Sequence, residues 1–161
     1  MNKRHALHLL LGATALTLAA CATTPAPTTI ADTAARTPQL STLAKLLNDA
    51  GLADTLRGAG PFTVFAPSDE AFKAVDAKTM ADLAANKDLL RSVLTYHVVP
   101  GRLTSAEVKT GNVKTVQGAN VALSKAGTFV TVEDAVVQTA DVPVTNGVVH
   151  VIDRVLIPPR R

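Results

Sequence analysis

The spacing of apolar residues changes near Val113, and this change limits the folds open to the chain. Before that point, apolar residues recur three and four positions apart, as on one face of a helix. After it, they alternate with polar residues or form short apolar runs between turn residues, which is typical of strands. Helices therefore precede strands, without the strand–helix–strand alternation of parallel sheets. The pattern predicts an α+β fold with a largely antiparallel sheet.

The part of the chain before Val113 is predicted to be mostly helical. Its strongest helical segment is Lys87–Tyr96, where Leu90, Leu94 and His97 share one face. The other segments predicted here are a helix Leu40–Ala50 ended by Gly51, a short turn Leu52–Leu56, a strand Phe62–Ala66, a helix after Ser68 whose Phe72 and Val75 face the core, and a helix Thr79–Ala85.

The part after Val113 is predicted to form hairpins. Asn146-Gly147 is the dipeptide best suited to a type I′ turn. The segment that follows is apolar on both faces, so we expect it to be a central strand. The predicted strands and loop are Val121–Ser124, Lys125–Gly127, Phe129–Val132, Val136–Val144 and Val148–Ile157.

Residues 1–21 are predicted to be a secretory signal that ends in a lipidation site. A short basic segment precedes the apolar run Ala6–Ala20, which is too short to span a membrane comfortably. Leu18–Cys21 matches a bacterial lipobox, in which the cysteine thiol is acylated and becomes the new N-terminus. We therefore expect an exported lipoprotein of the periplasm, the outer membrane or the cell surface. The alternative is ordinary cleavage at the Ala20–Ala22 pattern, which gives a soluble secreted protein.

Residues 22–37 are predicted to be a flexible tether. Six threonines, five alanines and two prolines offer little apolar area to offset the entropy lost on ordering. The following segment, 38–158, has the length of a single domain. Residues 159–161 form a short basic tail, which we expect to be solvated.

Charge and cysteine content exclude several classes of function. Of the 16 basic residues, Lys3 and Arg4 precede Cys21, so 14 remain against 13 acidic residues, a net charge of +1. With no basic stripe and an aromatic content of 3%, nucleic-acid binding is not expected. Cys21 is the only cysteine, so the folded part has no disulfide and no thiolate metal site. Since the chain also lacks a phosphate-binding loop, a calcium loop and paired catalytic carboxylates, we expect no metal, no cofactor and no enzymatic activity.

Three segments resemble the fasciclin domain family. Thr63–Phe72 is similar to its first signature motif, Asn146–Pro158 to its second, and Tyr96–Gly101 to its tyrosine-histidine motif. The resemblance implies a β-wedge packed with helices over residues 38–158. It also implies a role in cell adhesion, extracellular matrix or host contact, although a fold alone does not fix an activity. On this resemblance the structural motif residues are Phe65, Pro67, Ser68, Asp69, Phe72, His97, Asn146, Gly147, His150 and Asp153.

His97 and His150 are the histidines that follow the signal segment, and two interpretations compete. They could form a metal or general-base pair, or each could be a buried residue bonded to backbone or side-chain partners. We favour the structural interpretation because too few ligands are present for a zinc site, and an unpaired buried polar group costs about 1–3 kcal/mol. A buried His97 is expected to have a lowered pKa.

The polar residues of the signature motifs also have two interpretations. Ser68, Asp69 and Glu70 suit a helix cap and first turn, and Asp153 suits a carboxylate that binds backbone amides or a basic side chain. A hydrolase would instead require Ser68 or Ser92 bonded to His97 in an open cleft. Capping explains these residues more simply.

The predicted function is adhesion or surface contact by a non-catalytic, lipid-anchored domain. Its partner is expected to be a protein or polysaccharide of the envelope or host surface, and the lipid anchor is its membrane contact. The alternative is a periplasmic carrier or sensor of a small apolar or lipidic ligand. Asn86–Leu90 is similar to an integrin-binding motif of animal fasciclin domains, but it also makes a good helix start. The candidate contact residues are Lys87, Asp88, Arg91, Tyr96, Val98 and Val99.

Overall fold

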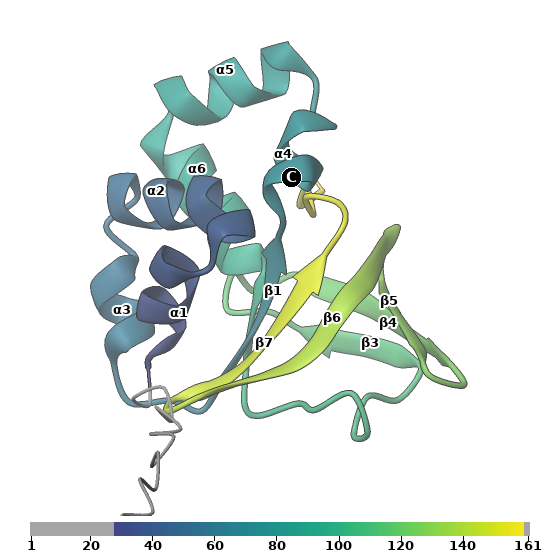
Figure 1. Ribbon diagram of the computed structural model, residues 1–161. Coiled ribbons are helices and arrows are strands. Elements are labelled where there is room, and N and C mark those ends of the chain that lie inside the picture. The colour runs from purple at the N-terminus through teal and green to yellow at the C-terminus, as the bar shows by residue number, and fades with distance from the viewer. Residues whose placement is uncertain (1–27, 160–161) are drawn as a thin grey trace, which may run out of the picture.

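The order of elements follows the apolar pattern. In residues 28–159, which the computed structural model describes, helices predominate early in the chain and strands late (Figure 1). The α-helices are α1 (Ile30–Arg36), α2 (Ser41–Asp49), α3 (Ala53–Arg57), α4 (Asp69–Lys73), α5 (Ala77–Ala85) and α6 (Lys87–Tyr96), with one 3₁₀ helix, η1 (Pro38–Leu40). The strands are β1 (Phe62–Pro67), β2 (Val98–Pro100), β3 (Gly111–Lys114), β4 (Asn120–Ala126), β5 (Phe129–Val132), β6 (Ala135–Val144) and β7 (Gly147–Ile152).

These strands form one curved, mostly antiparallel sheet. Their order is β2-β1-β7-β6-β5-β4-β3, and β1 and β7 are its parallel pair. The predicted α+β class and the largely antiparallel sheet are confirmed. The central position predicted for the last strand is confirmed as well, since β7 lies between β1 and β6.

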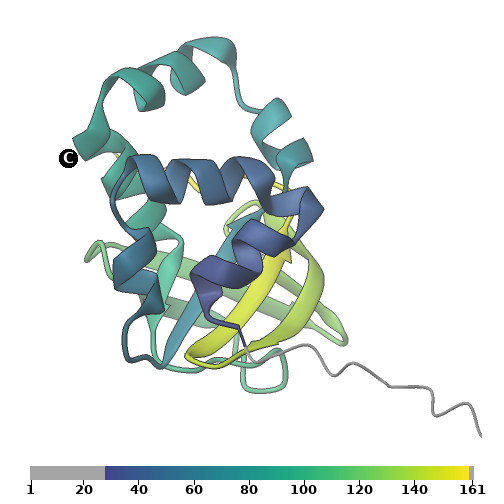
Figure 2. The ribbon, with the colours of Figure 1, turned by 60° about the vertical axis from the view of Figure 1, so that its left-hand side comes forward.

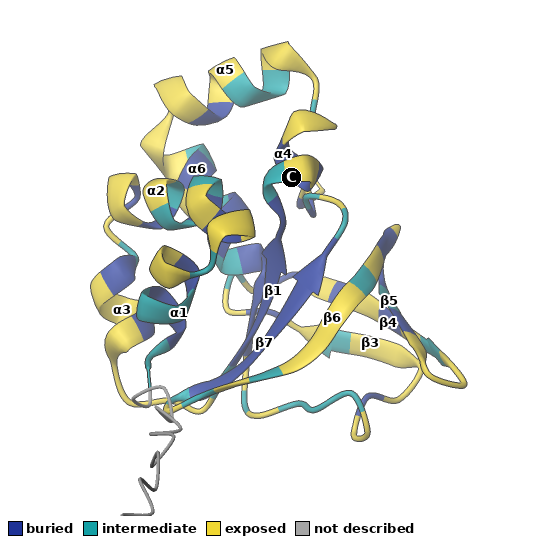
Figure 3. Cartoon of the chain, in the orientation of Figure 1, coloured by how far each residue is buried: buried dark blue, intermediate teal, exposed yellow. Residues whose placement is uncertain are grey.

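Successive residues of the central strands face two separate cores. Val64 of β1 and Val149 and Val151 of β7 belong to the core shared with the helices. Phe65 and Ile152 belong to a second core, closed by the inner faces of β4 and β5. Because neighbouring side chains of a strand point to opposite faces, a strand buried on both sides is apolar nearly throughout. All six residues of β7 are buried, and Figure 3 shows this strand in dark blue.

The helices begin and end close to the positions that their capping residues predict. Helix α6 spans Lys87–Tyr96 as predicted, and the Asn86 side chain accepts hydrogen bonds from the first turn. Ser68 caps α4 by accepting a hydrogen bond from the Ala71 amide at 3.2 Å. Gly51 follows α2 with a φ of 69°, a left-handed conformation that glycine adopts without strain.

The predicted flexible tether is wrong for its second part. Residues Ile30–Arg36 form α1, which lies across β7 (Figure 2), and Ile30, Ala31 and Ala34 are buried. The Thr145 amide donates to the Thr28 carbonyl oxygen at 3.0 Å, so the chain joins the fold beside the β6–β7 turn. One isoleucine and two alanines are too few to predict a helix, yet they are enough to dock a short helix onto a core that other elements have built. The predicted signal, Cys21 and residues 22–27 lie outside the described residues, as do Arg160 and Arg161 of the basic tail.

Two predictions about the last hairpin are also wrong. Strand β7 ends at Ile152, not at Ile157, and the chain then continues without regular structure. Val144 pairs directly with Gly147, so the turn consists of Thr145 and Asn146. Neither Asn146 nor Gly147 has a positive φ, which a type I′ turn at this dipeptide requires. Position 147 requires glycine for a different reason, because a Cβ atom there would lie 1.8 Å from the Phe62 carbonyl oxygen of β1.

Candidate functional site

His97 ends α6 and is bonded on both sides of its ring. It is 2% exposed, its Nδ1–H donates to the Val93 carbonyl oxygen at 2.8 Å, and Nε2 accepts from the Leu156 amide at 2.9 Å. This arrangement fixes a neutral ring with its proton on Nδ1. Burial lowers the pKa of His97 from 6.5 to about 4, while the bond to Val93 opposes the shift. The structural role and the lowered pKa predicted for His97 therefore both agree with its surroundings.

His150 lies in the middle of β7 and is 1% exposed. Its Nε2–H donates to the Leu103 carbonyl oxygen at 2.8 Å, and Nδ1 accepts from the Asp141 amide at 3.2 Å. The ring stacks on Phe65, with centroids 5.5 Å apart. Both histidines are thus occupied by backbone partners, and residues 28–159 contain no group of three metal-binding side chains.

A serine, a carboxylate and a histidine do meet at Asp141, in an arrangement that the sequence did not predict. The Asp141 carboxylate accepts from the Ser105 amide at 2.7 Å and from the Ser105 hydroxyl. Burial acts to raise the pKa of Asp141, but the bonds from Ser105 bring it below its ordinary value. The serine hydroxyl donates to the carboxylate, whereas the His150 ring accepts a hydrogen bond from the Asp141 backbone amide and not from the serine. The group fastens the loop around Ser105 to β6 and has no base positioned to activate the serine.

The other serines considered for a hydrolase have structural partners as well. Ser68 caps α4, and the Ser92 hydroxyl accepts from the Gln117 side chain at 3.2 Å. His97 bonds to the backbone of Val93 and Leu156, so neither serine is its partner. No nucleophile–base pair results.

Asn146 and Asp153 of the second signature segment hold backbone groups. The Asn146 side chain accepts from the Ile30 amide at 3.0 Å and donates to the carbonyl oxygens of Leu56 and Gly58 at 2.6 and 3.1 Å. It thereby joins the start of α1 to the end of α3. Asp153 accepts from the Val136 amide at 2.7 Å, which confirms the prediction that it binds a backbone amide.

Asp69 of the first signature segment connects two helices. Besides lying in the first turn of α4, its carboxylate accepts from the Thr42 amide at 2.8 Å and from the Ser41 hydroxyl at 2.6 Å. Burial acts to raise the pKa of Asp69, but these hydrogen bonds bring it below its ordinary value. Asp69 therefore caps α2 from 27 residues away.

Asp69→Ala is expected to lower the free energy of unfolding at pH 7 by about 1–2 kcal/mol, because it removes the cap of α2. Urea denaturation followed by circular dichroism measures the change. Glu70→Ala is the matched control, since Glu70 pairs with Lys73 at the surface and exposed pairs contribute little. Equal losses in the two variants would show that Asp69 does not act as a cap.

Part of the predicted contact segment is buried. Tyr96, Val98 and Val99 are 3%, 5% and 3% exposed, so they cannot contact a partner, and their assignment as contact residues is wrong. The single proton of the Tyr96 hydroxyl is shared between the Asn120 carbonyl oxygen, at 3.0 Å, and the Glu133 carboxylate, at 3.3 Å. Burial, and then the nearby Glu133 carboxylate, raise the pKa of Tyr96 to about 12.

The helical part of the predicted contact segment is exposed. Lys87, Asp88 and Arg91 lie on the outer face of α6. Arg91 also has a structural role, because its guanidinium donates to the Ala50 carbonyl oxygen at the end of α2, at 3.0 Å. The remaining motif residues Phe65, Pro67 and Phe72 are buried.

The hollows of the molecule differ in chemistry. A hollow with an entirely apolar surface, among Leu56, Phe62 and Val98, has a volume of about 30 Å³, roughly the share of one water in the liquid. That volume is far too small for an acyl chain.

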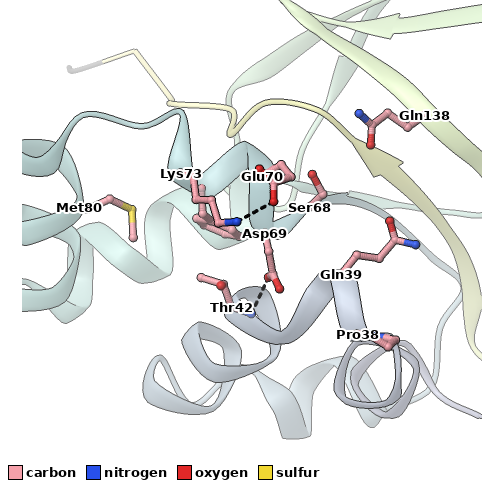
Figure 4. Close-up of a pocket in the computed structure, with 10 residues that line it drawn as sticks. Pro38, Gln39, Thr42, Ser68, Asp69, Glu70, Lys73, Met80 and Gln138 are labelled. Atoms are coloured by element: carbon pink, nitrogen blue, oxygen red, sulfur yellow. Dashed lines mark hydrogen bonds and ion pairs between the residues drawn. The ribbon is translucent and has the colours of Figure 1, made fainter.

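An open groove of about 650 Å³ lies between η1, α4, α5 and β6 (Figure 4). Its lining residues include Pro38, Gln39, Thr42, Ser68, Asp69, Glu70, Phe72, Lys73, Met80 and Gln138.

Comparison with known proteins identifies the family. The fasciclin domain model matches residues 38–158, and the chain belongs to the fasciclin domain family. The helix α1 precedes the matched region and still packs into the domain.

Relatives include proteins of several bacteria. Protein sll1483 of Synechocystis is 44% identical over 140 residues, which cover 86% of this chain and 78% of that protein. The immunogenic protein MPB70 of Mycobacterium bovis is 40% identical, with 81% of this chain and 69% of that protein covered. The cell surface glycolipoprotein MPB83 of the same species is 38% identical over 81% of this chain, but the match spans only 60% of MPB83.

A solved structure of a FAS1 domain pair from the insect cell adhesion molecule fasciclin I has the same fold. Its TM-score is 0.64 at 21% identity, with 81% of this chain and 51% of that chain covered. At this identity the likeness shows the fold alone. The predicted fasciclin-type β-wedge is confirmed.

Proposed function

We propose that this protein is a non-catalytic adhesion domain held to the cell envelope by an acylated Cys21. The observation that carries the proposal is the use of the motif residues: the side chains of His97, His150, Asn146 and Asp153 all bind backbone groups of the fold. Residues used in this way support a rigid scaffold and leave the exposed surface to meet a partner. A protein or polysaccharide of the envelope or host surface is the partner that we propose.

The anchor part of the proposal rests on the sequence around Cys21 and on a relative. Leu18–Cys21 ends an apolar run as a lipobox does. MPB83, a relative at 38% identity, is named a cell surface glycolipoprotein. Within residues 28–159, no helix combines the length and the hydropathy of a membrane span. Each buried methylene of an acyl chain contributes about 0.8 kcal/mol, so two or more chains hold a protein stably at a bilayer. We propose the periplasm or outer membrane as the location.

Cys21→Ser is expected to move the protein from the detergent phase to the aqueous phase when membranes are extracted, because the variant has no thiol to acylate. Cells that produce the variant are expected to lose the adhesion, to one another or to a surface, that the wild type confers. Phase partition, immunoblotting and an adhesion assay measure these changes. Thr23→Ser is the control, since it alters the same segment and keeps the thiol.

The two readouts separate the two parts of the proposal. A wild-type protein found in the aqueous phase would rule out the lipid anchor. A wild-type protein in the detergent phase, with equal adhesion of cells that have and lack it, would rule out the adhesive role. Cross-linking on intact cells then identifies what the domain contacts.

A further inference from the structure

The structure has two distinguishable ends. The described chain begins beside the β6–β7 turn, where Thr28 bonds to Thr145 and Ile30 bonds to Asn146. Helices α4 and α5 lie at the opposite end (Figure 1). Six residues lie between Cys21 and Thr28, so the seven Cα–Cα steps that join them span at most about 25 Å. If Cys21 is acylated, as the proposed function requires, this short span keeps the β6–β7 turn near the bilayer and leaves α4 and α5 at the end away from the anchor.

The open groove between η1, α4, α5 and β6 lies toward this outward end, and we call it the distal groove. Four exposed polar side chains surround it: Gln39 of η1, Glu70 and Lys73 of α4, and Gln138 of β6 (Figure 4). Within residues 28–159, neither glutamine side chain has a hydrogen-bond partner from the protein. Two carboxamides from segments about a hundred residues apart are thus brought to one hollow and remain able to bind.

The polar side chains at the base of the distal groove already have hydrogen-bond partners within the protein. Asp69 accepts from Ser41 and Thr42, and Ser68 accepts from the Ala71 amide. The two Asp69 bonds fix α4 against α2, and the Ser68 bond caps α4, so the groove is largely formed before any ligand arrives. Pre-formed sites lose less entropy on binding.

The side chains of the distal groove select the class of ligand. A carboxamide both donates and accepts, which matches the paired hydroxyl groups of a sugar. Glu70 and Lys73 neutralise each other at 2.6 Å, and Asp69 leaves one negative charge that repels polyanions. Pro38 and Met80 provide a small apolar area for the C–H face of a sugar ring. A protein partner usually inserts a large side chain into a desolvated pocket, and this open, polar groove has no such pocket.

We propose that the distal groove binds a neutral, hydroxyl-rich polysaccharide. The proposal rests on the proposed function, because the anchor proposed there lies at the end of the molecule opposite to the groove. It identifies the adhesive contact as sugar recognition by Gln39 and Gln138.

The test compares two double variants of the full chain, purified in a detergent without sugar groups. Gln39→Ala with Gln138→Ala removes both carboxamides, and Asn112→Ala with Ser124→Ala is the control on exposed positions of β3 and β4. Short neutral oligosaccharides of glucose, mannose, xylose and N-acetylglucosamine are titrated by NMR. At least one is expected to shift the amide signals of residues around Gln39, Lys73 and Gln138 until saturation. Its affinity should fall about tenfold in the groove variant and stay unchanged in the control.

Several results would overturn the proposal. These are the failure of every neutral oligosaccharide to saturate, equal affinity in both double variants, or saturation of the groove only by a peptide or an acidic polymer. Adhesion assays on cells then separate this inference from the proposed function. Adhesion that needs Cys21 but survives loss of both glutamines refutes the distal groove and leaves the anchored adhesion domain standing. Adhesion absent from wild-type cells refutes the proposed function itself, whatever the purified chain binds.

Discussion

Replacing Gly147 with alanine is expected to lower the free energy of unfolding by about 4 kcal/mol or more, or to prevent folding. Gly147 begins β7 and lies opposite Phe62 of β1 and Val144 of β6. An added Cβ would come within 1.8 Å of the Phe62 carbonyl oxygen, a backbone atom that cannot rotate away. The methyl group can be accommodated only by moving β1 away from β7, and these strands contribute to both cores. Urea denaturation followed by circular dichroism measures the loss.

Gly118→Ala is the matched control for this prediction. Gly118 has a φ of 103°, and a Cβ placed there meets no atom within 4 Å. Its replacement therefore costs only backbone strain, of order 1–3 kcal/mol. A loss at Gly147 no larger than at Gly118 would show that the approach of Phe62 does not determine the need for glycine.

Local signals in the sequence were sufficient to predict much of the fold. Helix α6 was predicted at its observed bounds because a cap at Asn86 and a regular apolar spacing agree over the same ten residues. The central position of β7 followed from apolar residues on both of its faces. These properties depend on a residue and its near neighbours, which a single sequence contains.

Properties that depend on distant segments could not be predicted. Helix α1 forms because Ile30, Ala31 and Ala34 find a core already built by other elements. The Asn146-Gly147 dipeptide indicates a turn, whereas position 147 requires glycine because the Phe62 backbone, 85 positions earlier, leaves no room for a Cβ atom. In each case the deciding partner is far away in the chain.

The same limit applies to the candidate site. The segment after α6 was expected to contact a partner, but its apolar residues Val98 and Val99 form the buried strand β2. The distal groove could not be predicted, because nothing in the sequence distinguishes Gln39 of η1 and Gln138 of β6 from other exposed polar residues. Their significance comes from the fold that places them around one hollow.

The second large effect concerns His97, whose replacement by alanine is expected to lower the free energy of unfolding by about 4 kcal/mol at pH 7. The change leaves a cavity and removes the partners of the Val93 carbonyl oxygen and the Leu156 amide. Because these bonds join α6 to the segment after β7, the loss should be accompanied by weaker cooperativity of unfolding. Urea denaturation of both proteins across a range of pH measures the effect.

The effect should depend on pH in a direction that the pKa of His97 determines. That pKa is about 4 in the folded protein and 6.5 when unperturbed, so between these values the unfolded chain binds the extra proton. The wild type should therefore lose about 3 kcal/mol of stability as the pH falls from 6.5 to 4, and the alanine variant should not show this loss. The gap between the two proteins is expected to shrink to about 1 kcal/mol near pH 4, since contributions from other titrating groups cancel in the difference. Lys87→Ala, at an exposed position of the same helix, should follow the wild type at every pH. Unchanged stability of the His97→Ala variant together with lost adhesion would show that this histidine serves binding and not the scaffold.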